Sequence, residues 1–179
     1  MHRLFVANRG EIALRVNRAA HALGLETVQA VSAADQDSMA AEVADQYVVL
    51  GPAQSKQSYL DPKLVVHAAK STGCDALHPG YGFLSERAEL ANLCDENGIT
   101  FVGPSGETIH ALGDKLQARK LADQAGVPLV PGTDQIADAN IAKQAAEELG
   151  FPVVMKALSL IHISEPTRRR LESRLAGWG

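Results

Sequence analysis

The first 103 residues alternate between short apolar clusters and stretches with helical spacing, and few folds are compatible with this alternation. Each apolar cluster is short, as buried parallel strands are. Strands and helices that follow one another through short connections require a parallel sheet with right-handed crossovers. We therefore predict an α/β fold with a Rossmann-like parallel sheet. The expected strands lie at residues 4–7, 27–31, 47–50, 75–77 and 99–102, with one more at 152–155.

The predicted helices lie between and after these strands. In the first helix, Ile12, Val16, Ala19 and Leu23 fall on one face, and Gly24 supplies the C-terminal stop. We expect this face to pack on the sheet. The other predicted helices run from 61 to 73, from 85 to 97, from 107 to 112, from 115 to 125 and from 139 to 149.

The alternation changes at about Gly103, where we place a domain boundary. We assign residues 1–103 to the Rossmann-like domain and residues 104–157 to a helical linker and the start of a second domain. The last segment differs in charge: residues 1–156 carry 13 basic and 19 acidic side chains, whereas residues 157–179 carry 4 and 2. We expect residues 158–179 to be a non-native tail.

Composition excludes several classes of protein and of site. The net charge of −4 argues against bulk nucleic-acid binding, which needs a basic surface. No apolar run approaches the roughly 20 residues of a membrane span, and no secretory signal is evident, so we expect a cytoplasmic protein without a membrane partner. Cys74 and Cys94 are not spaced as metal ligands, nor are His21, His67 and His110, so we expect no metal site among them.

The first candidate site is the loop of residues 7–11, which joins a predicted strand to a helix. Ligands of open parallel sheets gather at the carboxyl ends of the strands. Gly10 permits a tight turn, the helix N-terminus offers N–H groups to an anion, and Arg9 adds positive charge. Alternatively, Asn8 and Glu11 only cap the helix and Arg9 is solvated.

The second candidate site is the loop of residues 78–85, which contains Gly-x-Gly-x-x-Ser. This pattern is a near miss of the dinucleotide fingerprint, and it follows the fourth strand instead of the first. Gly80 and Gly82 indicate exposed, bent backbone that holds Tyr81 at the ligand edge of the sheet. The alternative is a plain turn with Tyr81 as an edge residue. We favour a binding loop.

Two lysines are candidates for binding phosphate. Lys115 opens a predicted helix, and Lys156 follows the apolar run at 152–155. An ammonium group at either place can contact a polyphosphate as a mobile point charge. The spacing of a P-loop is absent, and a solvated surface position is the alternative for both lysines, although it is weaker for Lys156.

Four motifs, taken in order, resemble the N-terminal part of biotin carboxylase, the ATP-grasp component of acetyl-CoA, propionyl-CoA, methylcrotonyl-CoA and pyruvate carboxylases. The resemblance covers about residues 2–157 and implies the start of a truncated ATP-grasp domain. The motifs are Phe-Val-Ala-Asn-Arg-Gly-Glu-Ile-Ala-Leu-Arg at 5–15, His-Pro-Gly-Tyr-Gly-Phe-Leu-Ser-Glu at 78–86, Phe-Val-Gly-Pro at 101–104 and Gly-Asp-Lys at 113–115.

The resemblance implies a ligase that carboxylates biotin on a carrier protein or domain. ATP and bicarbonate are then substrates, Mg²⁺ or Mn²⁺ binds the phosphates, and a carboxyltransferase and a second copy of the chain are partners. It also implies roles for residues of this sequence, with no catalytic or metal-binding residue in the chain. Lys115 and Lys156 match ATP-binding lysines, Arg18 matches a dimer contact, and His78, Gly80, Tyr81 and Gly82 match the loop that approaches biotin.

The sequence departs from the family pattern after Ala157. The family has a glycine-rich loop over the nucleotide phosphates there, whereas this chain has Leu-Ser-Leu-Ile-His-Ile. Branched apolar residues do not replace glycines at positive φ. We therefore expect the chain by itself to be inactive. The alternatives from other classes are a Rossmann-like nucleotide-binding module and an NAD(P)-dependent oxidoreductase.

Overall fold

The computed structural model describes residues 1–113, 115–133, 136 and 138–153. The chain divides into two compact units, Met1–Asp114 and Lys115–Gly179. The second unit contains α6 (Lys115–Gln124) and α7 (Ala139–Leu149). Half of the expected strand at 152–155 and the whole expected tail at 158–179 lie outside the described residues. The boundary placed near Gly103 stays a prediction.

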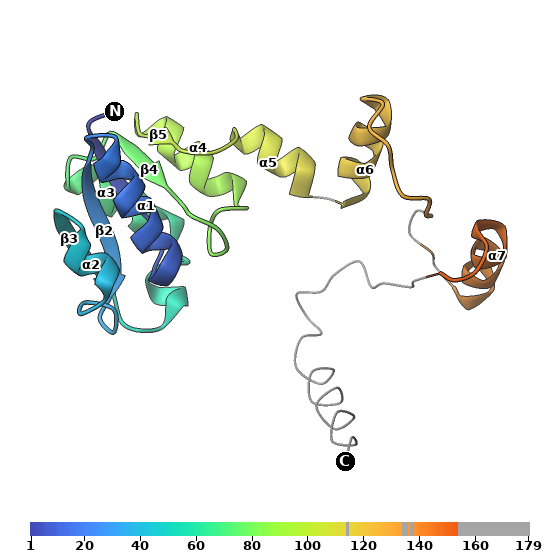
Figure 1. Ribbon diagram of the computed structural model, residues 1–179, viewed down its shortest axis with the longest axis horizontal. Helices are drawn as coiled ribbons and strands as arrows, with labels where there is room; N and C mark the ends of the chain where they lie inside the picture. The colour runs from blue at the N-terminus through green and yellow to red at the C-terminus, as the bar shows by residue number, and fades with distance from the viewer. Residues whose placement is uncertain (114, 134–135, 137, 154–179) are drawn as a thin grey trace, which may run out of the picture. The chain divides into compact units, whose positions relative to one another are not determined.

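The first unit is built on a parallel sheet with the strand order β3-β2-β1-β4-β5, which confirms the predicted α/β fold (Figure 1). The chain moves from β1 outward to β3 and then crosses to the other side of β1 to form β4. The strand order therefore reverses between β1 and β4. The strands are β1 (Arg3–Val6), β2 (Glu26–Ser32), β3 (Gln46–Gly51), β4 (Ala76–His78) and β5 (Thr100–Phe101).

Helices cover both faces of this sheet because successive side chains of a strand point to opposite faces. Leu4 and Val6 belong to one core cluster, with α1 and α2, whereas Phe5 belongs to the other, with α3 and α4. α5 follows β5 and contacts α4. The helices of this unit are α1 (Gly10–Ala22), α2 (Met39–Val43), the 3-10 turn η1 (Ser55–Gln57), α3 (Pro62–Ser71), α4 (Ala88–Glu96) and α5 (Gly106–Gly113).

The sequence predicted α3 well and did not predict α2 or η1. At the start of α3, the Asp61 side chain accepts a hydrogen bond from the Leu64 N–H group, and Pro62 occupies the first turn. Both features stabilise a helix start. The helix expected from residue 85 begins at Ala88, because residues 83–86 form turns instead.

The predicted buried face of α1 is wrong by about one residue. Val16 is buried as expected, but Ala19 is exposed and Leu23 is 77% exposed. Asn17 is buried instead: its Nδ2 donates to Gln29 Oε1 at 2.9 Å and to the Ala40 carbonyl at 3.2 Å, whereas its Oδ1 has no hydrogen-bond partner among the described residues. Small alanines complete this face and let the helix approach the sheet. The buried residues of α1 are Ala13, Val16, Asn17 and Ala20.

Two further observations bear on the sequence predictions. Cys74 and Cys94 are both buried and form no disulfide, and burial raises the pKa of the Cys94 thiol to about 11. Among the residues that the structure describes, no helix has the length and apolar character of a membrane span.

The sheet core gives a first testable prediction. Leu77→Ala removes a fully buried side chain from β4 and is expected to lower the free energy of unfolding by about 2–5 kcal/mol. Leu23→Ala removes the same atoms from an exposed position and is expected to change it by less than about 0.5 kcal/mol. Urea unfolding followed by circular dichroism measures both values. Equal losses would contradict the observed orientation of α1.

Candidate functional site

Two glycine-containing loops meet where the strand order reverses. One loop follows β1 and the other follows β4, and the Ala7 N–H group donates to the His78 carbonyl at 2.9 Å. The carboxyl ends of the strands at such a reversal are the usual ligand site of an open parallel sheet. The structure thus brings together the two loops that the sequence singled out.

The Asn8 side chain joins these loops. It is 3% exposed, and its Nδ2 donates to the carbonyls of Pro79 at 2.7 Å and Tyr81 at 2.8 Å. Its Oδ1 accepts the Arg9 N–H group at 2.9 Å. Asn8 therefore does not cap α1, and the alternative in which Asn8 only caps the helix is wrong. Arg9 is the N-cap residue, and its side chain makes no capping hydrogen bond.

The loop after β4 has a strained backbone that glycine permits. Gly80 and Gly82 have φ of +67° and +65°, and the following Phe83 has φ of +44°. A Cβ atom on Gly80 would lie 2.7 Å from Asn8 Nδ2, whereas nothing lies within 4 Å of a Cβ on Gly82. Gly80 is thus required by the close approach of Asn8 as well as by its φ.

His78 holds the start of the same loop. Its Nδ1 lies 2.9 Å from the Gly80 nitrogen, and a backbone N–H group can only donate. Nδ1 is therefore unprotonated, and the neutral ring carries its proton on Nε2. Burial lowers the pKa of His78, which favours the same neutral form.

Tyr81 stands at the edge of the sheet and is open to solvent. It is 64% exposed, and its hydroxyl donates to Glu11 Oε2 at 3.3 Å. The Tyr81 carbonyl is fixed by Asn8 while its ring stays accessible. This arrangement presents an aromatic face and a hydroxyl group to a ligand on a positioned loop.

The Arg9 side chain lies beside the loop after β4. It contacts other side chains, which differs from the alternative in which Arg9 is only solvated. Its guanidinium lies 5.8 Å from the ring centre of Tyr59 and 5.6 Å from that of Phe83. Those two rings stack on each other with a centroid distance of 5.1 Å. Arg9 Nη1 lies 3.7 Å from Asp35 Oδ2, although the Arg9 side chain is still 46% exposed.

Next to Arg9 lies a polar network of Ser32, Asp35 and Tyr59 that sequence reasoning did not find. The Tyr59 hydroxyl donates to Asp35 Oδ2 at 2.8 Å and accepts the Ser32 N–H group at 2.9 Å. Burial, and then the hydrogen bond to Asp35, raise the pKa of Tyr59 to about 12. Burial also opposes ionisation of Asp35, but hydrogen bonds from Ser32 and Tyr59 and the Arg9 charge outweigh it and lower the pKa of Asp35. In the sequence, Asp35 could have been noticed because it shortly follows the predicted strand at 27–31, whereas no sequence pattern indicated Tyr59.

Of the other predicted site residues, only Arg18 belongs to the first unit. Arg18 lies exposed on α1. Lys115 begins α6 in the second unit, and Lys156 lies outside the described residues. Among the residues with described positions, no three or more His, Cys, Asp or Glu side chains form a group that could hold a metal ion.

Comparison with known proteins decides the family. The family model described as "Biotin carboxylase, N-terminal domain" matches residues 1–109, which include both loops. The chain belongs to the biotin carboxylase family. A second model, "Carbamoyl-phosphate synthase L chain, ATP binding domain", matches residues 114–160. These matches confirm the resemblance inferred from the four motifs, and they do not favour the oxidoreductase alternative.

Relatives of known name agree with this family. The chain is 50% identical over 157 residues to Biotin carboxylase 1 of Bacillus subtilis, covering 87% of this chain and 35% of the relative. It is 45% identical over 159 residues to the biotin carboxylase of Haemophilus influenzae, covering 88% of this chain and 36% of that relative. The chain thus spans about a third of the length of these biotin carboxylase relatives.

A solved structure of a biotin carboxylase domain has the same fold. The domain dimer of Hydrogenobacter thermophilus 2-oxoglutarate carboxylase, solved with MgADP, ADP and bicarbonate, superposes with a TM-score of 0.79 at 42% identity. The match covers 87% of this chain and 34% of that chain.

Gly80 and Gly82, in the loop after β4, give a matched pair of variants. Gly80→Ala and Gly82→Ala both place a Cβ at positive φ, which is expected to cost about 1–2 kcal/mol. Only Gly80→Ala also displaces Asn8, so it is expected to destabilise the protein more. Urea unfolding gives the free energies, and amide hydrogen exchange at Tyr81 reports whether the loop has opened. Equal effects at both sites would contradict the Asn8 contact.

The neutral state of His78 predicts a pH dependence. Its pKa is lowered in the folded protein, so the unfolded chain binds a proton first as the pH falls below about 6.5. The free energy of unfolding is therefore expected to fall between about pH 7 and pH 5.5. His78→Asn keeps an acceptor for Gly80 and is expected to reduce this decrease, whereas His67→Asn, at an exposed histidine, is the control. An unchanged decrease in His78→Asn would contradict the assignment.

Proposed function

We propose that this chain forms the front part of an ATP-dependent biotin carboxylase. In the proposed reaction, ATP and bicarbonate react and the carboxyl group is transferred to a ring nitrogen of biotin on a carrier, with ADP and phosphate as the other products. The observation that carries this proposal is the loop after β4, fixed by Asn8 at the strand-order reversal of a chain in this family.

The proposed role of the edge is to position biotin. Tyr81 and Gly82 lie on the exposed part of the loop, and His78 and Gly80 hold its start in place. Backbone N–H and carbonyl groups of such a loop can pair with the ureido group of biotin. Because the loop is fixed before the substrate arrives, little ordering free energy is lost on binding.

The proposed role of the two lysines is to bind ATP. Cations that neutralise a transferring phosphoryl group are the main catalytic resource in such reactions. Lys115 and Lys156 lie in the segment matched by the ATP-binding model, which supports this assignment. Mg²⁺ or Mn²⁺, bound to the nucleotide phosphates, would supply further charge neutralisation. We place no metal ligand among the described residues.

The proposed partners follow from the same reaction. A biotin carrier protein or domain presents the acceptor, and a carboxyltransferase protein or domain consumes carboxybiotin. The biotin carboxylase domain of the Hydrogenobacter thermophilus relative was solved as a dimer, which supports a homodimer. We propose that Arg18, which is exposed on α1, lies at the contact. We propose a cytoplasmic location and no nucleic-acid partner.

A hybrid enzyme tests the proposal. Residues 2–157 replace the matching segment of Biotin carboxylase 1 of Bacillus subtilis, and ADP release is measured with and without bicarbonate and biotin. The hybrid is expected to hydrolyse ATP only when both are present. Lys156→Gln in the hybrid is expected to lower kcat/KM for ATP about a hundredfold, because a cation at the phosphates is lost.

Two controls make the result interpretable. Lys143→Gln removes the same charge at an exposed position on α7 and is expected to leave kcat/KM unchanged. The unaltered relative, measured alongside, sets the reference rate. A hybrid that folds like the relative yet releases no bicarbonate-dependent ADP would contradict the proposed function.

A further inference from the structure

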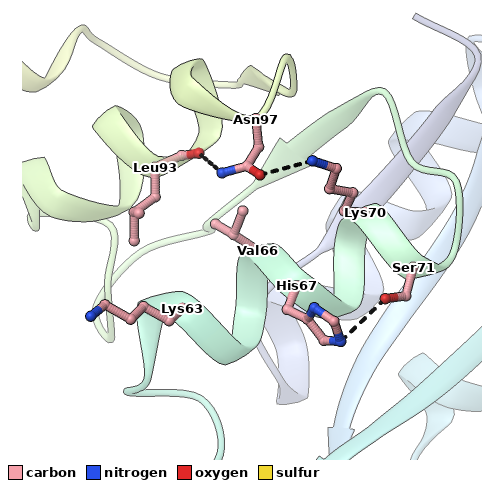
Figure 2. Close-up of a pocket in the computed structure, with 7 residues that line it drawn as sticks. All are labelled: Lys63, Val66, His67, Lys70, Ser71, Leu93 and Asn97. Carbon is pink, nitrogen blue, oxygen red and sulfur yellow. Dashed lines mark hydrogen bonds between the residues drawn. The ribbon is translucent and has the colours of Figure 1, made fainter.

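A groove separate from the sheet edge lies between α3 and α4 (Figure 2). Its volume is about 490 Å³, and α3 supplies most of its lining. Buried Val66 and half-buried Leu93 provide an apolar floor, and both pack in the core cluster on this face of the sheet. The polar lining comes from Lys63, His67, Lys70, Ser71 and Asn97.

The charge of this groove is opposite to that of the unit around it. Residues 1–113 carry eight Lys and Arg against 13 Asp and Glu. The lining of the groove nevertheless contains no carboxylate, and α3 has no Asp or Glu between Pro62 and Ser71. By contrast, a groove of about 540 Å³ that lies partly along α4 is lined by Asp95 and Glu107 and by no basic residue.

The cations of the groove are available to a ligand. Within the part of the chain that the structure describes, Lys63 has no hydrogen-bond or ion-pair partner. Lys70 is held across the groove by Asn97, whose Oδ1 accepts from Lys70 Nζ at 3.1 Å and whose Nδ2 donates to the Leu93 carbonyl at 2.8 Å. Figure 2 shows this bridge between the two helices. Lys70 is therefore held in position, whereas Lys63 can adjust its position to a ligand.

The spacing of the basic groups selects an extended ligand. Residues 63, 67 and 70 lie on one side of α3, and seven residues of helix rise by about 10 Å. A ligand that contacts the whole row must span about the same length. An extended peptide advances about 3.3 Å per residue and alternates its side chains between two faces, so carboxylates four residues apart share one face about 13 Å apart, within reach of the two flexible lysine side chains. The side chain midway between these carboxylates shares their face and reaches the floor.

We propose that the groove between α3 and α4 docks an acidic segment of a partner protein. Carboxylates of that segment pair with Lys63 and Lys70, and an apolar side chain between them covers Val66 and Leu93. This inference does not depend on the proposed carboxylase activity, because it uses no residue of the sheet edge.

Binding of a synthetic peptide to the 179-residue chain tests the inference. The probe is fluorescein-labelled Asp-Glu-Leu-Val-Glu-Asp, followed by fluorescence anisotropy at low and at physiological salt. Saturable binding is expected, and added salt should weaken it because the charges are exposed. The Lys63→Gln/Lys70→Gln double variant is expected to raise the Kd about fivefold or more. Lys56→Gln, at an exposed lysine on η1, is the matched control and should bind as the parent does.

Two altered peptides and one competitor complete the experiment. Asn-Gln-Leu-Val-Gln-Asn lacks the carboxylates and Asp-Glu-Ser-Ser-Glu-Asp lacks the apolar side chains, so both are expected to bind more weakly than the probe. Circular dichroism confirms that each protein variant is folded. The inference is overturned if no saturable binding occurs, if the double variant binds like the parent, or if either altered peptide binds equally well. Displacement of the probe by inorganic pyrophosphate at concentrations near the Kd of the probe would also overturn it, since it would show a general anion site.

Discussion

The geometry of the sheet edge depends on one buried amide group. Asn8 Nδ2 donates to two carbonyls of the loop after β4, and those carbonyls belong to residues more than 70 positions away in the sequence. Without these bonds, two buried or half-buried carbonyls would have no donor from this side chain, and the loop could relax away from positive φ. The left-handed backbone at Gly80 and Phe83 therefore persists because Asn8 supports it.

Asn8 is itself part of a chain of buried amides that crosses the unit. Asn17 on α1 donates to Gln29 Oε1 at 2.9 Å, and Gln29 Nε2 on β2 donates to the Asn8 carbonyl at 2.6 Å. All three side chains are buried. Each of these bonds pairs a buried donor that would otherwise be unsatisfied, so this chain specifies one register among α1, β2 and the two loops, although Asn17 Oδ1 itself is left without a partner among the described residues. The orientation of α1 is thereby linked to the position of Tyr81.

This chain of amides also shows what the sequence could and could not predict. The strands were predictable because each is a short apolar run, and α3 was predictable because Asp61 and Pro62 are local signals. The buried face of α1 was predicted wrongly because an apolar pattern gives no place to Asn17, whose partner lies twelve residues away. The loops were predicted as candidate sites from their glycines. The role of Asn8 was missed, because a hydrogen bond across 71 residues leaves no local pattern.

The sheet edge and the α3–α4 groove differ in the forces that shape them. Neutral groups hold the edge, namely the Asn8 amide and the neutral imidazole of His78, while the charge of Arg9 faces Asp35. Hydrogen bonds between buried neutral groups are little affected by salt, so the loop is expected to keep its geometry as the ionic strength changes. The groove instead relies on exposed lysines, whose attraction for an anion falls steeply with salt. The two surfaces therefore differ in their response to ionic strength: added salt weakens the proposed docking in the groove and leaves the loop at the sheet edge in place.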